Sequence, residues 1–245
     1  MEVVGELLAR DRRSRSVALV TPTGSERTYH DLITNGYKAA NVLRHLGTRE
    51  GATVAIDPKP SFHTVVAFLG AARLGAAVRF APHEGIDAGD RVVLAPVADE
   101  DALGPQPGTN LVVFGGPPDR PETTHWEAEL WSENPGTPPS GVGPGDPVIR
   151  GREPTADVSH RSLLDTAADV ATAEEIDDDT RVVLRTTFVE PNAVAAGVVA
   201  PLSRGGTTVL GEQRPADRTP RGDVAVVSDP TTTIPEDRRI VAADE

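Results

Sequence analysis

Residues Asp146–Leu164 read DPVIRGREPTADVSHRSLL and indicate an irregular loop that leads directly into a helix. Proline and glycine interrupt regular structure in the first half of this stretch. Ser159 is a favoured N-cap residue, and the apolar residues that follow it recur at helical spacing. We therefore expect a loop and then a helix that runs through Ala173, with an apolar face made of Leu163, Leu164, Ala167, Val170 and Ala171.

Some residues of this loop oppose phosphate binding, and others favour it. Loops of small residues bind phosphates through successive backbone N–H groups, usually with a lysine. Pro147 and Pro154 have no N–H to offer, and Glu153 would bring a negative charge toward a phosphate. Arg150 and Arg152 could still hold an anion, because guanidinium groups pair well with phosphate. The alternative is that they are two solvated surface arginines.

Upstream of the loop, the sequence predicts a strand–helix–strand unit. Thr28 and Asp31 form a capping-box pattern at the start of a helix that Gly47 ends. A strand is expected over residues 51–56, and Ser61 is expected to cap a helix over 62–74, which Gly75 ends before a strand over 76–82. A strand, a helix and a strand in this order are typical of a crossover in a parallel sheet.

Further short apolar runs predict buried strands throughout the chain. A short helix is expected near 124–130, between Pro/Gly-rich segments. The predicted fold class is α/β: a mostly parallel open sheet with helices on both faces. We divide the chain into an N-terminal α/β part, 1–138, and a second α/β part, 139–245, with an irregular tail. The expected strands are 17–20, 91–95, 110–114, 181–185, 207–210, 224–227 and 239–242.

Several motifs resemble, in the same order, those of the acyl-adenylate-forming superfamily, which includes acyl-CoA synthetases and the adenylation domains of peptide synthetases. The sequence SHRSLL at 159–164 resembles the S/T-H-R-x-L-L that follows the signature loop of that family, and Gly151–Pro154 resembles its "G-R-P". The other matching motifs are RTYHDL at 27–32, FLGAARLG at 68–75 and APLSRGG at 200–206. The resemblance covers residues 15–82 and 140–211, and it implies the fold of the N-terminal part of such an enzyme.

The same resemblance places a remnant phosphate loop at Arg150, Gly151, Arg152 and Thr155 and implies that its chemistry is degenerate. Val148, Ile149 and Arg150 stand where the family has Thr, Ser and Gly, and Thr155 stands at or near the lysine position. A histidine that many members carry in a later element is replaced around Glu190–Pro191. The adenine-binding segment, the ribose-binding aspartate and the C-terminal lysine of the family have no counterpart here. We therefore expect no catalytic residues and no required cofactor, with ATP or AMP and Mg²⁺ as the alternative ligands.

Three hypotheses about function follow from this resemblance. The first is a truncated, non-catalytic protein with a regulatory or partner-binding role. Its partner, another protein or a second copy, would bind the surface left by the missing C-terminal half. The second is an active or split acyl-CoA synthetase subunit that another chain completes. The third is a sensor that binds an anionic metabolite through Arg150 and Arg152.

The composition indicates where the protein works and which partners it lacks. The net charge is −13, and Lys38 and Lys59 are the only lysines among 24 basic residues, which favours the cytoplasm of a halophile, where salt screens self-repulsion. The sequence has no basic stripe that would predict binding to nucleic acid. It also has no apolar run or leader pattern that would predict insertion into a membrane. The sequence has no cysteine, and its six histidines lack the close spacing of a metal site, so we expect none.

Overall fold

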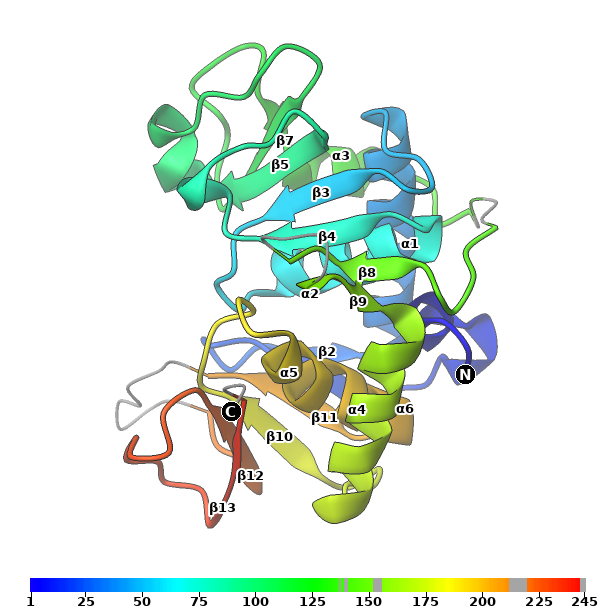
Figure 1. Cartoon of the computed structure of the whole chain (residues 1–245), viewed down its shortest axis with the longest axis vertical. Helices are drawn as coiled ribbons and strands as arrows, with labels where there is room; N and C mark the ends of the chain where they lie inside the picture. Colours follow the sequence, from blue (N-terminus) through cyan, green and yellow to red (C-terminus); the bar gives the residue numbers. More distant parts are fainter. Residues whose placement is uncertain (137, 139–140, 152–155, 212–219, 243–245) are drawn as a thin grey trace.

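The computed structural model describes residues 1–136, 138, 141–151, 156–211 and 220–242. Within these residues the strands form two sheets, which lie one above the other in Figure 1, with helices packed on their faces. Strands in both sheets are mostly parallel. The predicted fold class, α/β with mostly parallel strands, is confirmed, and the strands are shared between two sheets rather than one.

The seven-stranded sheet has the order β7-β6-β5-β3-β4-β8-β9. Helix α2 connects β3 to the neighbouring parallel strand β4, which is the crossover that the sequence predicted. The antiparallel pair at one end, β8 with β9, was not predicted. The strands are β3 (Thr53–Ile56), β4 (Ala77–Phe80), β5 (Asp90–Pro96), β6 (Asn110–Phe114), β7 (Thr124–His125), β8 (Pro147–Ile149) and β9 (Val158–Ser159).

The six-stranded sheet has the order β13-β12-β10-β11-β1-β2 and combines the two ends of the chain. Strand β1 pairs in parallel with β11, with Leu19 opposite Thr208. The two sheets therefore do not separate at residue 138, and the division into parts 1–138 and 139–245 stays a prediction. The strands are β1 (Val17–Val20), β2 (Glu26–Thr28), β10 (Arg181–Leu184), β11 (Thr207–Leu210), β12 (Val224–Val227) and β13 (Arg238–Val241).

The longer helices begin at the predicted caps. Thr28 forms a capping box with Asp31, and the side chains of Ser61 and Ser159 accept from the backbone N–H groups three residues later. Gly75 ends α2 at φ 75°, in a left-handed conformation that glycine adopts easily. The helices are α1 (Tyr29–His45), α2 (Phe62–Leu74), α3 (Trp126–Ser132), α4 (His160–Ala173), α5 (Pro191–Val194) and α6 (Ala200–Arg204).

Shorter helical turns complete the chain. A π-helical segment, η6 (Ala195–Val199), joins α5 to α6, so that residues 191–204 form one buried rod. The 3₁₀ turns are η1 (Val4–Leu8), η2 (Arg10–Arg12), η3 (Pro82–Glu84) and η4 (Val97–Ala102).

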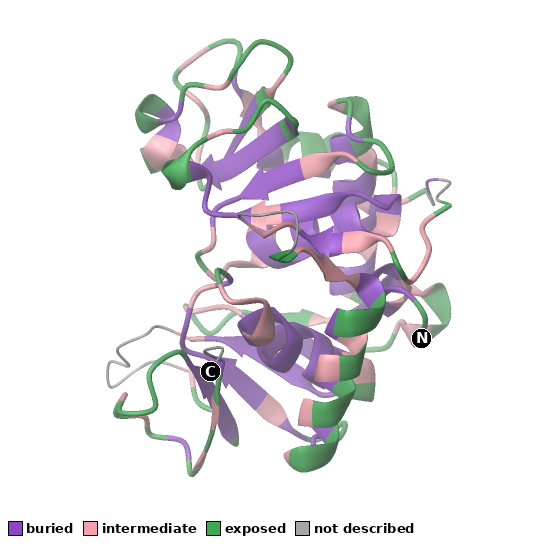
Figure 2. Cartoon of the chain, in the orientation of Figure 1, coloured by how far each residue is buried: buried purple, intermediate pink, exposed green. Residues whose placement is uncertain are grey.

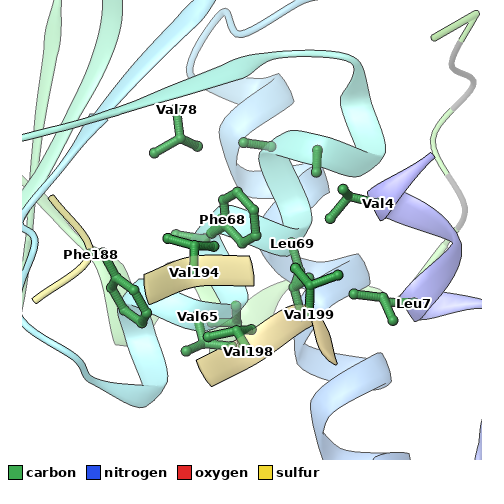
Figure 3. Close-up of a cluster of buried hydrophobic side chains, with 14 of the residues drawn as sticks. Val4, Leu7, Val65, Phe68, Leu69, Val78, Phe188, Val194, Val198 and Val199 are labelled. Atoms are coloured by element: carbon green, nitrogen blue, oxygen red, sulfur yellow. The ribbon is translucent and has the colours of Figure 1, made fainter. Parts of the chain in front are cut away.

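One hydrophobic core joins the two sheets. Side chains from α2, from η1 and from the 191–204 rod meet in it, as Figure 3 shows for Phe68, Leu7 and Val198. Phe80 at the end of β4 stacks against Phe188, with ring centroids 5.5 Å apart. Figure 2 shows the strands and α2 as largely buried, whereas the outer side of α4 is exposed. The core fixes the two sheets against each other and so shapes the space between them.

Candidate functional site

The candidate site is the loop between β8 and β9, which leads into α4. The antiparallel pairing of Pro147 with Ser159 brings both ends of the loop together at the start of the helix. Arg150 and Gly151 lie in the described part of this loop, whereas Arg152 and Thr155 lie outside the described residues. The structure therefore places two of the four predicted site residues.

Asp157 binds both of those residues. Its carboxylate accepts a hydrogen bond from Nη1 of Arg150 and another, at 3.1 Å, from the backbone N–H of Gly151. Only 15% of the Asp157 side chain is exposed. A guanidinium and a backbone N–H that converge on one point are the donors that a phosphate oxygen would use. Here the chain's own carboxylate holds that position.

The sequence prediction did not include Asp157. Asp157 lies seven positions after Arg150, but this spacing alone does not indicate a contact. The antiparallel β8–β9 pair brings the two residues close together, and that pairing was not predicted. Arg150 is also held at its backbone, where its N–H donates to the carbonyl of Val78 at 2.8 Å.

A second arginine near the loop is also paired. Arg79, on β4, forms an ion pair with the buried carboxylate of Asp90 and lies 3.4 Å from a carboxylate oxygen of Asp87. It also donates to the carbonyl of Gly85 at 2.9 Å. Arg150 and Arg79 are thus largely neutralised by carboxylates of the chain, which weakens their attraction for an external anion.

A cavity of about 350 Å³ opens beside the loop, between the two sheets. Its size is at the lower end of the range for small-molecule sites. Its lining combines polar and apolar groups. They come from the end of β4, the loop, β9, α4, the segment before α5 and the start of α5, and include Arg79, Arg150, Val158, Leu163, Val189 and Asn192.

His160, the first residue of α4, has a structural role in linking two segments of the chain. It is fully buried, and its Nδ1 accepts the backbone N–H of Val4 at 3.1 Å, which ties η1 to α4. Burial lowers the pKa of His160 to about 4, against a smaller opposing effect of Asp146. The imidazole is therefore neutral at pH 7, and Ser159 beside it serves as the helix cap, as predicted.

Comparison with known proteins shows which proteins share this fold. Residues 8–83 match the sequence model of the AMP-binding enzyme family. The structure superposes on an anthranilate CoA ligase solved with anthranoyl-AMP, with a TM-score of 0.76 and 17% identity, over 92% of this chain and 49% of that one. The chain has the fold of the N-terminal half of adenylate-forming enzymes. This finding confirms the resemblance that the motifs indicated.

Two further solved structures agree. A benzoate CoA ligase from Burkholderia xenovorans gives a TM-score of 0.74 at 20% identity, over 92% of this chain and 50% of that one. The N-terminal domain of FACL13 from Mycobacterium tuberculosis gives 0.71 at 19% identity, over 93% and 63%. The chain thus spans about half the length of the complete ligases that it resembles. No curated protein matches the sequence.

No helix among the described residues is long and apolar enough to cross a membrane.

Proposed function

We propose that this protein is a non-catalytic relative of the acyl-CoA synthetases with a regulatory or partner-binding role. The single observation that carries the proposal is the position of Asp157, whose carboxylate takes the Arg150 and Gly151 donors of the remnant phosphate loop. An ATP phosphate would have to displace a negative charge that is covalently part of the chain, so the local concentration of the competing anion is high.

The residues around the loop support the same proposal. Val148 and Ile149 are buried strand residues that pack into the core, in the positions where the resemblance implies small hydroxyl residues. The lysines of the chain, Lys38 and Lys59, lie in α1 and after β3, outside the loop. Stabilising the charge that develops on an α-phosphate requires oriented donors or cations, and in the described part of this loop the donors of Arg150 and Gly151 are already bound by Asp157.

A second candidate function is that of an acyl-CoA synthetase subunit that another chain completes. The cavity beside the loop favours it, because its 350 Å³ could hold a small acyl or aryl group next to Arg150. In this candidate, ATP with Mg²⁺ would bind between the two chains, and the second chain would supply the missing cations.

Titration calorimetry tests whether this chain binds nucleotide on its own. ATP and AMP, each with Mg²⁺, are titrated in molar potassium chloride into the wild-type chain, into Arg150→Ala and into the exposed control Arg161→Ala. We expect no binding at millimolar nucleotide. Micromolar binding that Arg150→Ala abolishes and Arg161→Ala preserves would overturn the non-catalytic proposal.

The partner-binding role includes self-association as its simplest form. Light scattering of the purified chain then gives a mass near twice 25.8 kDa, whereas binding to a different protein leaves the isolated chain at 25.8 kDa.

The same samples test the proposal that the protein works in a salt-rich cytoplasm. If the charge of −13 is adapted to high salt, the unfolding temperature rises as potassium chloride is raised toward molar concentration.

A further inference from the structure

Three side chains from three different loops meet above the seven-stranded sheet. Asp57 directly follows β3, His83 lies in η3 after β4, and Asp99 lies in η4 after β5. Nε2 of His83 is 3.2 Å from Oδ2 of Asp57 and 3.6 Å from Oδ2 of Asp99. One ligand atom from each residue fits within 4.8 Å of the other two.

The cluster lies at the switch point of this sheet. From β3 the chain moves to β4 on one side, and it then returns to β5 on the other side of β3. The two faces are covered by different segments: α2 packs on one, and residues around Ile86 and Leu103 pack on the other. In open α/β sheets the crevice outside the carboxyl ends of the strands at such a point is where ligands bind. Asp57 and Asp99 follow the two strands that flank it.

Nε2 of His83 lies within hydrogen-bonding distance of Oδ2 of Asp57, and the spacing of the three ligand atoms also suits a shared cation. An imidazole Nε2–H can donate one good hydrogen bond, yet two carboxylates approach this nitrogen. Both distances exceed the roughly 2.7–2.9 Å of a charge-assisted bond between nitrogen and a carboxylate. A tetrahedral Zn²⁺ with ligands at about 2.0–2.2 Å has ligand atoms about 3.3–3.6 Å apart, by geometry. The two separations from His83 Nε2, 3.2 and 3.6 Å, are close to that spacing, and all three ligand atoms lie within 4.8 Å of one another.

The neighbouring backbone holds Asp57 in place. The second oxygen of Asp57, Oδ1, accepts the backbone N–H of Lys59 at 2.9 Å, so Oδ2 is directed toward the cluster. The Asp57 side chain is only 8% exposed, whereas His83 and Asp99 are 38% and 40% exposed. A buried carboxylate on one side and solvent on the other leave room for a water in a fourth position.

We propose that Asp57, His83 and Asp99 bind a divalent first-row transition-metal cation, with Zn²⁺ as the best fit. One imidazole and two carboxylates suit Zn²⁺ better than Ca²⁺ or Mg²⁺, which prefer ligand sets made only of oxygen. The site is separate from the remnant phosphate loop and does not depend on the proposed function. Sequence spacing gave no sign of it, because its ligands come from three separate loops at 57, 83 and 99.

The test uses the whole chain, treated with a chelator and then titrated with Co²⁺ and with Zn²⁺. Excess Mg²⁺ is present throughout to saturate weak sites on an acidic surface of net charge −13. We expect one equivalent to bind, the visible absorption of four-coordinate Co²⁺ to develop, and Zn²⁺ to displace it. The unfolding temperature should rise with Zn²⁺ concentration, because a cation that binds only the folded state stabilises it.

Two exposed ligands allow variants that should fold normally. His83→Ala and Asp99→Asn should each weaken the affinity by about tenfold or more and abolish the Co²⁺ absorption. The matched control is His45→Ala, since Nδ1 of His45 is 3.0 Å from a single carboxylate, that of Glu133, and its side chain is 71% exposed. This variant should bind as the wild type does. The proposal is wrong if the wild type takes up no stoichiometric cation, or if His83→Ala and His45→Ala bind it equally well.

Discussion

Asp157 accepts hydrogen bonds from both the guanidinium of Arg150 and the N–H of Gly151, and it thereby closes the loop between β8 and β9 from within. The same two donors would face a phosphate if the carboxylate were absent. Side-chain carboxylates and phosphate oxygens compete for the same donors, because both are anionic acceptors. This contact satisfies the Arg150 and Gly151 donors from within the chain, and it can be removed by changing one residue.

Asp157→Asn should open the loop to anions. Asparagine keeps the size of the side chain but removes the charge that competes with a phosphate, so Arg150 gains an unopposed positive charge. We expect inorganic pyrophosphate to bind about tenfold or more tightly than to the wild type, as measured by calorimetry, because a single charge contact is worth about 1.5–3 kcal/mol. The ion pair is partly buried, with the Arg150 and Asp157 side chains 33% and 15% exposed, so its loss should lower stability by about 1 kcal/mol or somewhat more, above the usual value for a surface pair.

The control for this prediction is Asp169→Asn, which removes the same charge from an exposed position on α4. A general effect of lower negative charge would strengthen pyrophosphate binding in both variants alike. If the two variants bind equally, Asp157 does not guard the loop. The combined variant Asp157→Asn/Arg150→Ala should return to the wild-type affinity.

Local sequence signals predicted much of the fold. The caps at Thr28, Ser61 and Ser159 were correct, because a cap depends on atoms within three or four residues of each other. Strands such as β6 and β11 were placed at their observed bounds, since short buried apolar runs have few alternatives.

Long-range pairing could not be predicted in the same way. The pairing of β1 with β11, nearly 190 residues later in the chain, depends on the whole core rather than on local spacing. The β8–β9 pair was missed because two strands of three and two residues, Pro147–Ile149 and Val158–Ser159, are too short to show a period. The contact of Asp157 with Arg150 depends on that pair, so the chemistry of the site could not be predicted either.

A buried ion pair fastens the segment before β13 to β10. Arg185 donates to both oxygens of Glu236, at 2.8 and 2.6 Å, and both side chains are 0% exposed. Glu236→Leu removes the carboxylate that accepts two hydrogen bonds from the buried Arg185 guanidinium, and we expect the free energy of unfolding to fall by roughly 3–5 kcal/mol. Denaturant titration followed by circular dichroism measures this change.

The double variant Arg185→Met/Glu236→Leu is the informative control. It removes both charges together, and replacing a buried pair by apolar side chains is often close to neutral. The double variant should therefore be more stable than Glu236→Leu alone. A double variant that is no more stable than Glu236→Leu would contradict this account.

His160 should make stability depend on pH in the mildly acidic range. Burial lowers its folded pKa to about 4, whereas an unfolded histidine has a pKa near 6.5. The unfolded chain therefore binds a proton more readily than the folded chain. Protonation of His160 does not affect the free energy of unfolding above about pH 6.5, and it lowers that free energy progressively as the pH falls toward 4. The loss amounts to roughly 3 kcal/mol.

Thermal unfolding at a series of pH values measures this effect. His160→Gln keeps a side-chain acceptor near the backbone N–H of Val4 but has no titrating ring. Its stability should decline less steeply between pH 6.5 and 4 than that of the wild type, whatever its absolute value at pH 7. Parallel curves for the two proteins would show that His160 does not cause the decline, which would then belong to the carboxylates.

Gly70 allows α1 and α2 to pack closely. A Cβ at this position would lie 2.8 Å from the backbone nitrogen of Ala40, and a helix backbone cannot move as a flexible side chain can. Gly70→Ala should therefore cost about 1–3 kcal/mol from overpacking, more than the roughly 0.5–1 kcal/mol that alanine gains over glycine in a helix. Gly89→Ala, where nothing lies within 4 Å of the new Cβ, should leave the denaturation midpoint nearly unchanged. Equal midpoints for both variants would show that the two helices can separate without cost.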